Sequence, residues 1–181
     1  MRVSKYFKLG RTQPSLSFVD VNIDGDVRLF VSPRAIRLLP TEWGDECVSL
    51  VQSFFAKVLD YIRSGRNQDA VDLLQVLREP NETHLGLSTG RSRGRGLGSG
   101  SAEDVWSAFS RSKAARSGLL TDLEDTVLMI EGISVDIVSD VVTNIIRAPL
   151  ISYTQECCAL YGIPLTSNVA SGPTWNPRKN E

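Results

Sequence analysis

The stretch 90–100 combines arginine and glycine in a pattern that suits phosphate binding. It reads Gly-Arg-Ser-Arg-Gly-Arg-Gly-Leu-Gly-Ser-Gly, with one apolar residue. Glycine lets backbone N–H groups approach a phosphate closely, and arginine presents forked donors to phosphate oxygens. We expect Arg91, Arg93 and Arg95 to bind phosphate. The close backbone approach is expected at three glycines: Gly94, Gly96 and Gly98.

This loop matches neither of the common glycine fingerprints. The dinucleotide fingerprint places its third glycine three residues after the second, and the Walker A loop requires Gly-Lys-Ser/Thr. The loop lacks both features. Two interpretations stay open, namely contact with a nucleic-acid or nucleotide phosphate and a flexible connection that its arginines keep in solution.

Carboxylates flank the apolar run 126–130, which we predict to be a buried strand. Asp122 and Asp125 precede the run and Glu131 follows it. Many Mg²⁺-dependent nucleases hold their metal with carboxylates at the ends of a central strand, because Mg²⁺ prefers oxygen ligands. The restriction-enzyme pattern also needs Asp/Glu-x-Lys, but Gly and Ile follow Glu131. Ordinary turn acids beside a strand are the alternative, so Mg²⁺ is a possible cofactor only.

A third polar group is predicted on one face of a helix over 134–147. At about 100° per residue, five side chains fall within an arc of roughly 100°. They are Asp136, Asp140, Thr143, Asn144 and Arg147. Short polar residues are poor helix formers, and a solvated face usually carries Glu, Lys and Gln. We expect Asp136, Asp140 and Asn144 to hold a cation or to orient the loop arginines, with a plain solvated face as the alternative.

Net charge and cysteine spacing limit the partners and the cellular compartment expected for this chain. The net charge is −1 over 181 residues, so any contact with nucleic acid must come from a local patch. The three cysteines, Cys47, Cys157 and Cys158, lack the spacing of a zinc site and predict reduced thiols in the cytoplasm. No apolar run is long enough to span a membrane.

The elements that must position these groups follow from hydrophobic periodicity. Alternation predicts a hairpin of strands 18–23 and 27–31, and a further short strand at 84–88. Apolar stripes predict the helices, over 45–64, 67–78, 101–116, 134–147 and on to Tyr161. We therefore expect one α/β or α+β domain over 1–166, with a small sheet and about five helices. A polar tail is predicted over 167–181.

Part of the chain resembles uncharacterised bacterial proteins found in phage-defence and mobile-element gene neighbourhoods. The resemblance covers about residues 80–165. It rests on the runs 84–88, 91–98 and 120–125, on Ser139-Asp140, Asn144 and Arg147, and on Tyr153-Thr-Gln155. It implies a defence role on nucleic acid. Those relatives look longer, so the tail is expected to connect to a missing C-terminal part or partner.

Three functions are therefore expected in different classes. The first is a subunit of a defence or mobile-element system that contacts nucleic acid or nucleotide phosphate through the Arg/Gly loop. The second is a non-catalytic protein–protein module that binds another subunit or a second copy. The third is a Mg²⁺-dependent nuclease built on Asp122, Asp125 and Glu131, and whether the chain is an enzyme stays open.

Overall fold

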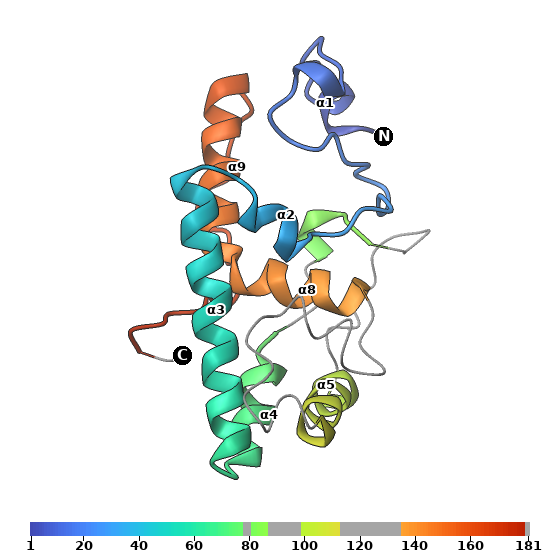
Figure 1. Cartoon of the computed structure of the whole chain (residues 1–181). Helices are drawn as coiled ribbons and strands as arrows, with labels where there is room; N and C mark the ends of the chain where they lie inside the picture. Colours follow the sequence, from blue (N-terminus) through green and yellow to red (C-terminus); the bar gives the residue numbers. More distant parts are fainter. Residues whose placement is uncertain (78–80, 87–98, 113–134, 180–181) are drawn as a thin grey trace.

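The computed structural model describes residues 1–77, 81–86, 99–112 and 135–179 (Figure 1). The α-helices in these residues are α1 (Val3–Tyr6), α2 (Pro33–Arg37), α3 (Glu42–Arg63), α4 (Asn67–Gln75), α5 (Ser99–Arg111), α8 (Val135–Ile145) and α9 (Arg147–Tyr161). Two short 3-10 turns, η1 (Gln13–Ser15) and η2 (Asn81–Thr83), complete the described elements.

The prediction of an α/β or α+β domain with a small sheet is wrong. The described residues contain no strand, and their only β pairing is two isolated bridges, Arg2 with Asn22 and Val27 with Leu85. The protein is mostly helical. The alternation over 18–23 does not produce a strand. Asp20, a polar position that a half-buried strand would turn to solvent, is buried and accepts hydrogen bonds from Ser4. The predicted strand 126–130 lies outside the described residues.

The long helix α3 forms the centre of the core, and its prediction over 45–64 is confirmed with a start three residues earlier. Thr41 caps its N-terminus, accepting a hydrogen bond from the backbone N–H of Gly44 at 3.1 Å. Gly65, at a φ of +75°, follows its last turn. Its apolar stripe is buried throughout, so burial of this face is the main stabilising term of the fold. The buried residues on this stripe include Val51, Phe54, Phe55, Val58, Leu59 and Ile62.

The other helices pack around α3 at two ends of the molecule. Figure 1 shows α4 and α5 gathered at one end of α3, α8 crossing near its middle, and α9 toward the other end. Both α2 and α9 also contact α3. The helical segment is interrupted between α8 and α9 at Ile146, three residues before Pro149. Pro149 lies in the first turn of α9, where its missing N–H has no intrahelical acceptor to lose.

The C-terminal segment, predicted to be a polar tail over 167–181, packs on the core through Trp175. The indole N–H of Trp175 donates to Ser53 Oγ at 2.9 Å. Its ring meets Phe54 edge to face, with the centroids 5.1 Å apart. Sequence pattern does not reveal this contact, because a single aromatic residue in a polar segment has no periodicity.

We predict that Trp175→Ala lowers the free energy of unfolding by about 2 kcal/mol, because it removes a partly buried aromatic ring from the surface of α3. Trp175→Phe should lose about 1 kcal/mol, since it removes chiefly the hydrogen bond. Urea denaturation followed by far-UV circular dichroism measures both. Leu165→Ala, at a side chain that is 60% exposed, is the control. Equal stability of Trp175→Ala and the parent would show that the segment does not pack.

Candidate functional site

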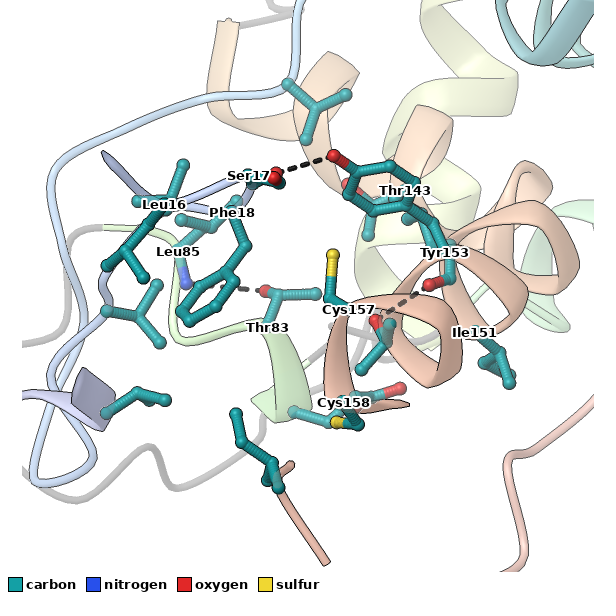
Figure 2. Close-up of a pocket in the computed structure, with 18 of the residues that line it drawn as sticks. Leu16, Ser17, Phe18, Thr83, Leu85, Thr143, Ile151, Tyr153, Cys157 and Cys158 are labelled. Atoms are coloured by element: carbon teal, nitrogen blue, oxygen red, sulfur yellow. Dashed lines mark hydrogen bonds between the residues drawn. The ribbon is translucent and has the colours of Figure 1, made fainter. Parts of the chain in front are cut away.

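A largely apolar cavity of about 790 Å³ lies between the N-terminal segment, residues 1–21, and helix α9. Figure 2 shows Leu16 and Phe18 reaching it from the N-terminal segment, and Ile151, Tyr153 and Cys157 reaching it from α9. The turn η2 and helix α8 close the remaining sides. Segments far apart in the sequence therefore form one binding space.

The N-terminal wall of the cavity is a folded loop held by a buried carboxylate. Asp20, which is 8% exposed, accepts hydrogen bonds from the backbone N–H of Ser4 at 2.8 Å and from its hydroxyl at 2.6 Å. The Asp20 N–H donates to Gln13 Oε1 at 2.8 Å, and Gln13 Nε2 donates to the Phe18 carbonyl at 2.8 Å. A buried carboxylate is stable only when hydrogen bonds replace its water, so these contacts determine the loop shape.

Two tyrosines of α9 attach this loop to the helix. Tyr153 donates to the carbonyl of Ser17 at 2.5 Å, and the Tyr161 hydroxyl accepts from the Ser17 N–H at 2.9 Å. The Tyr161 ring also packs edge to face on Phe18, 5.5 Å between centroids, beneath the guanidinium of Arg11. Burial raises the pKa of Tyr153, so its hydroxyl remains a donor at neutral pH. The contacts join the loop to α9 at the cavity edge.

Arg147, the first residue of α9, places a positive charge in the cavity wall. Its side chain is 12% exposed. Nη1 donates to the Glu82 carboxylate and to the Ser171 carbonyl, the latter at 2.7 Å, and Nη2 donates to Asn144 Oδ1 at 2.9 Å. The guanidinium thus joins α8, α9, η2 and the C-terminal segment.

The structure brings together some members of the predicted polar helix face. Asn144 is 6% exposed and Thr143 is 4% exposed, so this part of the face is buried rather than solvated. Asn144 Nδ2 donates to the backbone carbonyl of Asp140 at 2.8 Å, while its oxygen accepts from Arg147. The amide of Asn144 therefore positions Arg147. In the part of the chain that the structure describes, no three His, Cys, Asp or Glu side chains gather where they could hold a metal ion.

The other predicted sites lie outside the described residues. These are the phosphate loop with Arg91, Arg93, Arg95, Gly94, Gly96 and Gly98, and the acidic cluster with Asp122, Asp125 and Glu131. Phosphate binding by the loop and Mg²⁺ binding by the carboxylates both stay predictions. The orientation of the loop arginines by Asp136 and Asp140 also stays a prediction.

Cys157 and Cys158 line the cavity, and the chemistry of Cys158 is not that of an activated nucleophile. Burial, together with the neighbouring Cys157, raises the pKa of Cys158. Burial and the nearby Glu46 raise the pKa of the core thiol Cys47 to about 12. A thiol with a raised pKa carries little reactive thiolate at neutral pH. These side chains therefore contribute apolar surface to the wall and to the core.

Sequence reasoning missed the residues that build this cavity. Ser17 and Tyr161 lie 144 positions apart along the chain. No sequence motif joins them or Asp20. One usable signal was present, since Tyr153 and Tyr161 recur on one helix that also carries a weakly segregated apolar face. Such a helix is expected to be covered on more than one side.

Fold and site together define a mostly helical protein with an apolar cavity and, among the described residues of its wall, one largely buried arginine, whose side chain is 12% exposed. Residues 8–181 match the family described as Domain of unknown function (DUF8370), so the chain belongs to this family. Neither a curated protein nor a solved structure matches the chain. Among the helices of the described residues, none combines the length and apolar composition needed to cross a membrane.

We predict that Asn144→Ala lowers the free energy of unfolding by about 2 kcal/mol, because it removes the amide oxygen that accepts a hydrogen bond from the charged Arg147 guanidinium. Asp136→Ala, about two helical turns away on the same predicted face, should change it by less than about 0.5 kcal/mol. Chemical denaturation of the two variants gives the comparison. Similar losses in both would contradict the positioning role of Asn144.

Proposed function

We propose that this protein is a non-catalytic binding module and that its cavity takes a small ligand with an apolar body. The observation that carries the proposal is the cavity itself. Its volume of about 790 Å³ falls within the range of about 300–1,000 Å³ that is usual for small-molecule sites. Its wall is mainly apolar with a few convergent polar groups, which is the composition of such sites.

The chemistry of the wall favours binding over catalysis. The Cys158 thiol has a raised pKa, and the Tyr153 hydroxyl is engaged with a backbone carbonyl. The amide of Asn144 holds Arg147 in place. Polar groups committed to fixed protein partners orient a ligand more readily than they transfer protons to it.

We predict that the neutral apolar dye N-phenyl-1-naphthylamine binds in the cavity with increased fluorescence. Cys158→Trp should weaken this binding at least about tenfold, because the indole occupies part of the space. Titration of dye fluorescence measures the affinity. Ala159→Trp is the matched control, since Ala159 is exposed on the same helix turn and is absent from the wall.

Two results would contradict the cavity proposal. The first is a parent protein that does not bind the dye at any accessible concentration. The second is equal weakening by Cys158→Trp and Ala159→Trp while both variants keep the helical circular dichroism of the parent.

A second candidate function is phosphate contact by the Arg/Gly loop, and one observation favours it. Helix α5 begins at Ser99, directly after the loop sequence that ends at Gly98. A helix N-terminus carries a partial positive charge and unsatisfied N–H groups, which attract anions. Three arginines immediately before it strengthen the case for nucleic-acid or nucleotide phosphate as the partner of this loop.

We predict that changing Arg91, Arg93 and Arg95 together to Ala weakens binding to a DNA duplex and reduces the slope of log affinity against log salt by about 0.9 per lost phosphate contact. Fluorescence anisotropy at several salt concentrations measures both quantities. A triple Ala variant at three exposed arginines elsewhere, Arg28, Arg34 and Arg178, is the control. Unchanged binding in the loop variant would reject the phosphate role.

The setting of this binding module is also a proposal. Three free thiols suit a reducing compartment such as the cytoplasm. Association with another protein subunit or a second copy fits a module without its own chemistry. The defence role implied by the resemblance, and the nuclease built on the acidic cluster, stay predictions.

A further inference from the structure

Arg147 is the one basic side chain in the cavity wall formed by the described residues, and it is largely removed from water. Its side chain is 12% exposed, and the wall around it is mainly apolar. A buried cation is costly unless an anion and hydrogen-bond acceptors replace its water. The cavity therefore favours an occupant that brings a negative charge to this point of its wall.

The partners of the guanidinium divide into fixed neutral groups and one exposed anion. Asn144 Oδ1, at 2.9 Å, and the Ser171 carbonyl, at 2.7 Å, are uncharged. The anion is Glu82, which also lines the cavity and whose side chain is 58% exposed. An ion pair with so exposed a partner contributes little net stability. Glu82 can therefore leave Arg147 for water when another carboxylate arrives.

One donor of the guanidinium has no acceptor at all. Nε of Arg147 is buried and finds no hydrogen-bond partner in the described part of the chain. An unmade hydrogen bond at a buried charged group is destabilising. A carboxylate has two oxygens and frequently takes two donors of one guanidinium. Because Nε is buried in this conformation, a carboxylate that replaces Glu82 reaches Nε once the Arg147 side chain turns, and it then satisfies a donor that Glu82 leaves unsatisfied.

We infer that the ligand of this cavity is a small monocarboxylic acid with an apolar chain, and that its carboxylate replaces Glu82 on Arg147. The inference rests on the proposed function, that the cavity takes a small apolar-bodied ligand, and adds the chemistry of the head group. The apolar wall supplies affinity, at roughly fourfold for each CH₂ that leaves water. Arg147 supplies the selection for negative charge.

The test compares two ligands with the same chain and different heads. Decanoate and 1-decanol, both below their aggregation limits, displace N-phenyl-1-naphthylamine from the parent protein. Decanoate should act at a concentration at least about tenfold lower, since a charge-assisted hydrogen bond supplies at least that factor. Glu82→Gln should strengthen decanoate by up to about fivefold, because it removes the competing carboxylate, and should leave decanol unchanged.

Arg147→Met tests the cation directly. It should abolish the advantage of decanoate over decanol, whereas Arg34→Met, an equal loss of charge at an exposed position outside the wall, should preserve it. Because Arg147 has structural contacts, the Glu82→Gln result provides a test at an exposed position that does not depend on how the fold tolerates Arg147→Met.

The outcomes separate this inference from the function on which it rests. Equal displacement by decanoate and decanol in the parent overturns the head-group assignment, and retained dye binding then leaves the cavity function standing. Failure of the dye to bind rejects the cavity function itself. If sedimentation shows a dimer and the dye enters only upon dilution to monomer, a second copy is the occupant and the monocarboxylic acid is overturned.

Discussion

The guanidinium of Arg147 is the point where four segments of this protein meet. Arg147 is the first residue of α9. Its guanidinium donates hydrogen bonds to the side-chain oxygen of Asn144 in α8, to the Ser171 carbonyl and to the Glu82 carboxylate. A charge that is 12% exposed requires acceptors within reach, and the chain supplies them from positions up to 65 residues away. The hydrogen bonds of Arg147 to Asn144 and to the Ser171 carbonyl constrain how the C-terminal segment lies against α8 and α9.

A separate set of hydrogen bonds explains why a space persists in an otherwise packed protein. Apolar walls tend to collapse on one another, because burial of their surface is favourable. Here the N-terminal wall is held by Asp20 and Ser4, and its attachment to α9 is made by Tyr153 and Tyr161 at Ser17. Hydrogen bonds are directional and set distances, so a hydrogen-bonded frame keeps the apolar side chains of the two walls apart.

The predictions from sequence were most successful where structure depends on neighbouring residues. The helices α3, α4 and α8 follow from apolar residues at three- and four-residue spacing, and they lie where the pattern indicated. The same reasoning singled out Asn144 and Arg147 as one group, and the two side chains are in contact. The contacts of Arg147 with Glu82 and with the Ser171 carbonyl were not predicted. That Asp136, Asp140 and Asn144 hold a cation or orient the loop arginines stays a prediction.

Predictions failed where a partner had to be chosen at long range. Alternation over 18–23 and 27–31 indicated a hairpin, yet Val27 pairs with Leu85, and Asp20 binds Ser4. An α-helix closes its hydrogen bonds four residues apart, so the sequence by itself determined the helices and the polar face of α8. An extended segment or a buried charge takes its partner from anywhere in the chain. The absence of a sheet in the described residues, the cavity and the surroundings of Arg147 were therefore decided only by the tertiary structure.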